Sequence, residues 1–311
     1  MPNYLNVFFR SIIESLTEFL PVSSTGHLFL YSSFFPFVEL GENTINFDDL
    51  FDIFIQTGAI FSVIVLYFSY LWDRLKQAFS YSLGKTKDKG GLNFILSIIV
   101  GSFPVMLVGF ALKDFLNVIK SREDLLLILG LAWLLGGLVI LVVEWKFSHF
   151  DYAQCSEPSQ NSEPSQHSES SASSLPERSR REQNEREAVS LKKASLIGIF
   201  QCIALIPGVS RSAATIITGR MLGLTKKDAA EFSFFLAIPV LIAAGIYKLY
   251  KHRAILNSDT LPLLALGSIL SFVFCFLIIK WFLAYIKKHS FSLFGYYRVL
   301  LGLGVIIFFY R

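Results

Sequence analysis

The chain is poor in cysteine and in charge. Its three cysteines, Cys155, Cys202 and Cys275, stand alone among 311 residues, with neither the spacing of a disulfide framework nor that of a zinc site. Charged residues make up 17%, and the net charge of +4 does not indicate a nucleic-acid partner, because lysine and arginine lie between apolar runs. The N-terminus lacks the pattern of a cleavable signal, so we expect its first apolar segment to be retained.

Long apolar runs dominate the sequence instead, with 53% hydrophobic residues and 31 phenylalanines. About 20 apolar residues are enough to cross the hydrocarbon core of a bilayer as a helix. Six windows meet this condition: 50–71, 93–113, 124–145, 231–250, 260–283 and 293–310. Two more apolar stretches, 5–37 and 195–222, are broken in the middle by proline, glycine and polar residues. The sequence therefore predicts an all-α polytopic membrane protein.

The two halves of the chain resemble each other. Residues 1–150 and 191–311 flank a Ser/Glu/Pro-rich tract at 151–190, which we expect to be a disordered linker on the cytoplasmic side because it cannot bury enough apolar surface to fold. "ESLTEFLPVSSTGHL" in the first half corresponds to "QCIALIPGVSRSAAT" in the second, and three later stretches match in the same order. Each half holds one broken segment and three spans, an odd number that inverts the second half. We predict six transmembrane helices plus two re-entrant helix-loop-helix segments in an inverted-topology repeat, facing each other across a cavity.

Two carboxylates lie in the first broken segment. Glu14 and Glu18 are four residues apart, so on a helix they share one face. Carboxylates at membrane depth are costly unless they meet a cation, a metal or water. The pair either faces bulk water or handles a divalent cation or protons. For a metal, we expect Mg²⁺, with Ca²⁺ as the alternative.

Hydroxyl groups and a histidine follow directly. Pro21 is expected to end the helix, and the turn containing Ser23, Ser24 and Thr25 exposes hydroxyl and N–H groups. A lone histidine in an apolar setting is commonly a satisfied core residue. His27, however, lies within a few residues of a hydroxyl nucleophile and two carboxylates, which favours a catalytic role.

The second broken segment carries a cation. In "PGVSRSAAT", Arg211 stands between two serines after a Pro-Gly turn and before a predicted helix. A helix start presents N–H groups to an anion, and a guanidinium fork suits phosphate oxygens. The alternative is that Arg211 pairs with Glu14 or Glu18 across the repeat. Together, acids, hydroxyls, an imidazole and an arginine indicate phosphoryl transfer more than a conduction path.

These motifs closely resemble the two signature motifs of the undecaprenyl-diphosphatase family, the bacitracin-resistance proteins of bacterial envelopes. "FDIFIQTGAI" and "EFSFFLAIP" fit the family's other characteristic stretches, and only residues 150–190 fall outside the resemblance. It implies hydrolysis of undecaprenyl diphosphate to the monophosphate, which recycles the carrier lipid for peptidoglycan synthesis and confers bacitracin resistance. It also implies a bacterial inner-membrane location, with the site opening to the periplasmic face.

The resemblance implies a catalytic set and a phosphate pocket. The catalytic residues carried over by motif position are Glu14, Glu18, Ser24, His27 and Arg211. The residues expected to line the phosphate pocket are Ser23, Thr25, Ser210, Ser212 and Thr215. Two features depart from the family: Ala213 replaces a usual glycine, and the linker is longer. The nucleophile stays open among Ser24, His27 and water.

Orientation and rival functions complete the expectations. Six crossings put both termini on one side, and the basic connections on the other side place both termini outside by the positive-inside rule. The rival function is a polyprenyl-phosphate flippase or transporter that uses the same pocket, since inverted repeats and helix breaks are typical of transporters. A structural membrane protein is the third possibility. Besides the lipid substrate and membrane lipids, a homo-oligomer is left open.

Overall fold

The computed structural model describes residues 3–37, 44–120, 124–155 and 189–309, which are almost wholly helical and contain no strand. Within these ranges six helices are long and apolar enough to cross a membrane. They are α3 (Thr44–Leu66), α5 (Gly90–Ala111), α7 (Leu125–Cys155), α11 (Lys226–Lys251), α12 (Thr260–Lys288) and α13 (Ser292–Phe309). The prediction of an all-α protein with six spans is confirmed.

One span boundary differs from its prediction. The first apolar window was expected to run to residue 71, but α3 ends at Leu66 and α4 (Phe68–Ser82) begins after Tyr67. Tyr67 leaves helical geometry, with φ −106° and ψ 15°. The aromatic and aliphatic residues continue through this break, so hydropathy alone does not reveal it.

Two pairs of shorter helices form the broken segments. The first pair is α1 (Asn3–Thr17) and α2 (Ser24–Phe34). The second is α9 (Leu191–Gln201) and α10 (Arg211–Met221), with the single turn η2 (Cys202–Leu205) after α9. None of these four helices has the roughly 20 residues needed to cross a bilayer alone. Both breaks lie where proline and the polar turns predict them.

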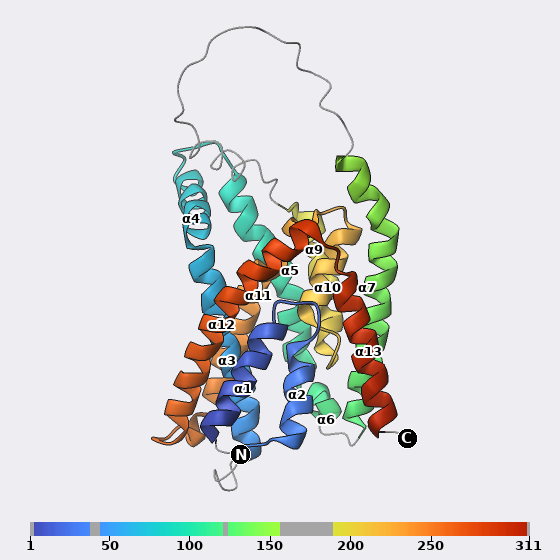
Figure 1. Ribbon diagram of the computed structural model, residues 1–311. Helices are drawn as coiled ribbons and strands as arrows, with labels where there is room; N and C mark the ends of the chain where they lie inside the picture. The colour runs from blue at the N-terminus through green and yellow to red at the C-terminus, as the bar shows by residue number, and fades with distance from the viewer. Residues whose placement is uncertain (1–2, 38–43, 121–123, 156–188, 310–311) are drawn as a thin grey trace, which may run out of the picture.

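The two broken segments meet inside the bundle. Figure 1 shows the turn between α1 and α2 at mid-height of the bundle, with α10 beside it, while the start of α1 and the end of α13 lie at the same end. The Ser212 hydroxyl donates to the Leu20 carbonyl over 2.7 Å, which joins the two turns directly. Phe19, Leu20 and Ile216 belong to one buried apolar cluster that surrounds this junction.

The outer surface is apolar, as expected for a helix bundle in contact with lipid. Phe110 is 66% exposed and Phe308 72% exposed, and many other large apolar side chains share this position. The remaining helices, α6 (Lys113–Lys120) and the short η3 (Arg253–Ile255), follow α5 and α11. Of the predicted linker, residues 151–155 continue α7, and residues 156–188 lie outside the described residues. The division into two halves stays a prediction.

Candidate active site

The turn after α1 brings a carboxylate to a hydroxyl. The Glu18 amide donates to the Glu14 carbonyl over 2.9 Å, so the two carboxylates lie one helical turn apart, as their spacing predicts. The chain then reverses through Ser23, whose φ of 77° is unusual for a residue with a side chain. Ser24 opens α2, and its hydroxyl donates a short hydrogen bond to Oε2 of Glu18.

The turn before α10 has a related backbone. Gly208 and Ser210 both adopt positive φ, 91° and 77°. Ser210 is the N-cap of α10, and its hydroxyl accepts from the Ala213 amide over 3.1 Å. Capping satisfies a donor that the first helical turn leaves unpaired. Arg211 therefore projects from the first position of a well-defined helix.

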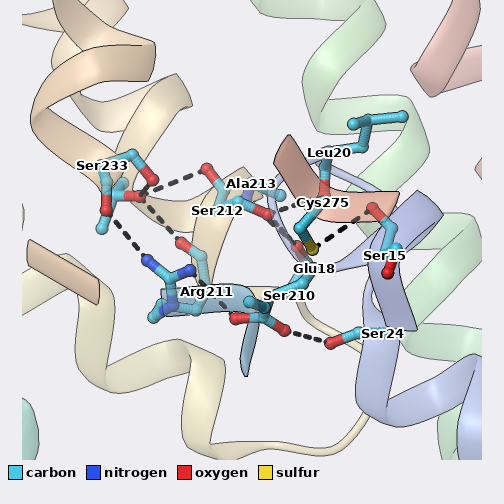
Figure 2. A network of polar contacts seen from close by, with 12 residues as sticks. Ser15, Glu18, Leu20, Ser24, Ser210, Arg211, Ser212, Ala213, Ser233 and Cys275 are labelled. Atoms are coloured by element: carbon cyan, nitrogen blue, oxygen red, sulfur yellow. Dashed lines mark hydrogen bonds and ion pairs between the residues drawn. The ribbon is translucent and has the colours of Figure 1, made fainter. Parts of the chain in front are cut away.

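Glu18 connects the two turns. Arg211 donates through Nη2 to Oε1 of Glu18 over 3.1 Å, and through Nη1 to the Ser233 carbonyl over 2.9 Å. Figure 2 shows the resulting chain from Arg211 through Glu18 to Ser24. Each oxygen of the Glu18 carboxylate thus has its own partner. A hydroxyl, a proton acceptor and a cation lie in contact, which is the arrangement of an activated nucleophile.

These groups line a cavity of about 340 Å³ between the two halves of the chain. Six of the predicted site residues contribute to its wall: Glu18, Ser23, Ser24, Thr25, Ser210 and Arg211. Leu205, Ile206 and Leu241 supply apolar wall. The cavity therefore combines a polar end with an apolar side, as a phosphorylated lipid requires.

The other four predicted site residues lie behind this wall. The hydroxyl of Thr215 donates to the Ser233 hydroxyl over 2.7 Å, and Ser212 bonds to Leu20 as described. Both hydroxyls therefore hold the second turn in place. Glu14 is fully buried, and neither of its carboxylate oxygens has a hydrogen-bond partner among the described residues.

His27 points away from the Ser24–Glu18 pair. Its Nδ1 lies 2.7 Å from the Ser23 carbonyl, and its Nε2 lies 2.7 Å from the Tyr297 hydroxyl. A carbonyl only accepts, so Nδ1 carries a proton, and in the neutral imidazole Nε2 then accepts from the Tyr297 hydroxyl. The imidazole also stacks on the Tyr297 ring, with centroids 5.7 Å apart. In this arrangement both ring nitrogens are engaged in supporting the first turn.

Arg298 is a further residue of the site that sequence reasoning missed. It is fully buried on α13, and Nη1 donates to the Pro21 carbonyl of the first turn (3.2 Å) and the Val209 carbonyl of the second (3.0 Å). Nη2 donates to the Gly208 carbonyl over 3.1 Å. Gly136 makes room for this group, because a Cβ there would lie 2.2 Å from Nη2. The sequence signal that could have identified Arg298 is a lone arginine inside an apolar span.

Gln56 is the second residue that was missed. It lies on α3, is 8% exposed and lines the cavity. It comes from the stretch "FDIFIQTGAI", which was quoted above as part of the family resemblance without any residue in it being assigned a role. An amide in a run of apolar residues was the signal for a cavity-facing position.

The two glutamates supply some of the ligands that a divalent cation would need. Among the described residues no three of the His, Cys, Asp and Glu side chains gather as a metal site. Mg²⁺, however, is commonly held by one or two carboxylates together with substrate phosphates and water. The buried, unpartnered oxygens of Glu14, one turn from Glu18, suit such an ion.

Comparison with known proteins gives consistent results. The family model described as bacitracin resistance protein BacA matches residues 7–304. An undecaprenyl-diphosphatase of Leptospira biflexa serovar Patoc is 53% identical over 311 residues, the whole of both chains. The undecaprenyl-diphosphatase of Leptospira interrogans serovar copenhageni is 53% identical over 307 residues, which cover 99% of this chain and 98% of that protein. That of Acidovorax ebreus is 36% identical over 307 residues, 97% of this chain and 94% of its own.

Proposed function

The chain belongs to the bacitracin resistance protein BacA family, and on this premise we propose that it is an integral-membrane phosphatase acting on undecaprenyl diphosphate. The products are undecaprenyl phosphate and inorganic phosphate. The reaction returns the carrier lipid to peptidoglycan synthesis and removes the diphosphate that bacitracin recognises. The relatives are named as diphosphatases, and nothing in the comparisons supports the flippase alternative.

The observation that carries the mechanism is the position of Glu18 between Ser24 and Arg211. Glu18 takes the proton of the Ser24 hydroxyl as Oγ bonds to the terminal phosphorus, and the bond from phosphorus to the bridging oxygen breaks. Undecaprenyl phosphate leaves with that oxygen. Water then attacks the phosphoserine, inorganic phosphate departs, and the serine oxygen recovers a proton.

Arg211 stabilises the charge on the transferred phosphoryl group. Its Nε has no hydrogen-bond partner among the described residues, while Nη1 and Nη2 fix the guanidinium plane. A cation held in place before the reaction stabilises the transition state without reorganising. We assign the base role to Glu18 and a supporting role to His27, because both nitrogens of the imidazole are already bonded.

A divalent cation, Mg²⁺ or alternatively Ca²⁺, is part of the proposal. Glu14 and Glu18 would hold it, and such an ion neutralises charge on phosphate oxygens. The unpartnered oxygens of Glu14 support this assignment. Glu18 also forms an ion pair with Arg211, so its carboxylate would lie beside both positive groups.

We also propose the membrane arrangement. The two broken segments are re-entrant, and the halves form an inverted-topology repeat, which the shared backbone of the two serine turns supports. The protein is placed in the bacterial inner membrane with both termini outside. The cavity then opens to the periplasmic face, where the carrier lipid is released after polymer transfer.

Phosphate release from undecaprenyl diphosphate by the detergent-purified protein tests the activity, because detergent leaves no bilayer across which to transport. We expect release that Ser24→Ala abolishes and that excess EDTA strongly reduces. A phosphoserine trapped at Ser24 by rapid acid quench would establish the covalent route. If folded protein releases no phosphate, the phosphatase proposal is wrong. If release continues in EDTA, only the proposed role of the divalent cation is wrong.

A further inference from the structure

The cavity continues beyond the groups that the proposed reaction uses. At its other end it is lined by Lys113, Lys248 and Lys251. Lys113 begins α6, and the other two belong to the last turn of α11. Figure 1 places α6 near the end of the bundle that holds the start of α1 and the end of α13. The lysines therefore form the mouth of the cavity.

The mouth carries net positive charge. Lys248 is largely buried and forms an ion pair with Asp49 of α3, which fixes its position. Lys113 and Lys251 are exposed at the rim. Burial, and then the nearby Lys248 ammonium, lower the pKa of His252 below its ordinary value, so the ring adds no charge at neutral pH. Two lysines thus remain available to an anion, beside a third that is held in place.

A diphosphate needs more than one cationic partner. Arg211 is one cation, and it is partly neutralised by Glu18 at the inner end of the cavity. A diphosphate that moves through the mouth towards Ser24 and Arg211 passes the lysines, and its charge needs positive groups there because unpaired charge in a cavity with apolar walls is costly. The lysines are the other cations that line this cavity among the described residues.

We propose that Lys113, Lys248 and Lys251 form a second phosphate subsite at the cavity mouth. This proposal rests on the proposed phosphatase function and extends it. The ligand is a phosphate group from one of two sources: the diphosphate of the incoming substrate before it reaches Ser24, or the inorganic phosphate that leaves after hydrolysis. Leu116, Leu205 and Ala244 line the same cavity and offer the lipid chain an apolar wall.

The test is a double substitution, Lys113→Gln with Lys251→Gln, which leaves the Lys248–Asp49 pair intact. Steady-state hydrolysis of undecaprenyl diphosphate is measured in nonionic detergent at fixed ionic strength, with and without inorganic phosphate as product inhibitor. Loss of two partly exposed charge contacts is expected to change binding by about fivefold. The Lys113→Arg, Lys251→Arg protein, which keeps both charges, should behave like the wild type.

The two sources give different results. A KM raised about fivefold, with kcat and phosphate inhibition unchanged, assigns the subsite to the diphosphate of the incoming substrate. An inhibition constant for phosphate raised about fivefold, with KM unchanged, assigns it to the released phosphate. Changes in both assign it to both. If neither constant moves, the proposal is wrong.

A matched control excludes a general effect of surface charge. Lys280 and Lys287 line a different cavity, on the half of α12 remote from the mouth. Lys280→Gln with Lys287→Gln removes the same charge and should leave both constants unchanged. Equal shifts in the control and test proteins would overturn the subsite.

Failure of the subsite and failure of the phosphatase are separable. If wild-type protein releases no phosphate, the proposed function fails whatever the lysines do. Binding of inorganic phosphate is then titrated by ³¹P NMR in Ser24→Ala protein with and without the double substitution. Binding weakened about fivefold supports the subsite, and an unchanged Kd contradicts it.

Discussion

The two serine turns share a positive φ at one serine but differ in their chemistry. Ser23 and Ser210 both have φ 77° and directly precede a helix, and among the described residues no other non-glycine residue has positive φ. Such a conformation costs about 1–3 kcal/mol and persists only where the surrounding contacts impose it. The first turn carries the hydroxyl and the carboxylate, whereas the second carries the arginine.

The turns also differ in what holds them. Ser210 caps its own helix through the bond from the Ala213 amide, while Ser23 makes no side-chain cap. Arg298 donates to carbonyls of both turns, whereas the first turn also accepts from Trp133 of α7, at the Val22 carbonyl. The comparison shows how one backbone motif serves two purposes. The self-capped turn positions a cation, and the turn without a cap directs the Ser24 hydroxyl to Glu18.

The largest effect should come from removing the hydroxyl of the first turn. Ser24→Ala deletes the group that donates to Glu18, and we expect kcat to fall by about 10⁴-fold. Initial rates of phosphate release check this. Ser33→Ala on the same helix removes a hydroxyl that bonds only to the Phe29 carbonyl and should retain full activity. A Ser24→Ala rate close to the wild type would exclude Ser24 as the nucleophile and leave water or His27.

Changing the cation of the second turn should have the next largest effect. Arg211→Lys keeps the charge but loses the fork that contacts Glu18 and the Ser233 carbonyl, so we expect kcat to fall by about 10³-fold. The control is Arg220→Lys, at the far end of the same helix and beside Glu144. If Arg211→Lys protein is as active as Arg220→Lys protein, Arg211 has no role in the reaction.

The link between the turns is tested at Arg298, a positioning residue. Lysine cannot reach the Pro21, Gly208 and Val209 carbonyls together, so the turns should shift relative to each other. We expect Arg298→Lys to lower kcat by about 10²-fold, with a smaller change in KM.

Arg10→Lys is the control for this link. Arg10 is also fully buried but pairs with Asp48 and Asp52. Both variants should lose stability, which thermal unfolding reports. A loss of kcat no greater for Arg298→Lys than for Arg10→Lys would reduce Arg298 to a structural role.

The smallest effect concerns capping. Ser210→Ala removes the cap of α10 and should lower the free energy of unfolding by about 1 kcal/mol, whereas Ser23→Ala removes no cap and should cost a few tenths. Denaturant titration in detergent, followed by circular dichroism, measures the difference. If both variants lose the same free energy of unfolding, the two turns do not differ in capping.

Sequence reasoning located the elements of the site better than their contacts. It placed both helix breaks correctly, and it placed Glu14 and Glu18 one turn apart, because these features depend on neighbouring residues. It favoured His27 as a catalytic group on its closeness in sequence to Ser24. The structure bonds the imidazole to Tyr297, a residue whose proximity only the folded chain reveals, and the catalytic role of His27 stays a prediction.

The sequence by itself determined that this protein is a helical membrane bundle with two polar interruptions, since apolar length and turn residues act locally. Only the tertiary structure decided that Glu18 joins Ser24 to Arg211, and that Arg298 binds the carbonyls of both turns. The physical reason is that these contacts link segments far apart in the chain. Their geometry is set by how the helices pack, which no local pattern encodes.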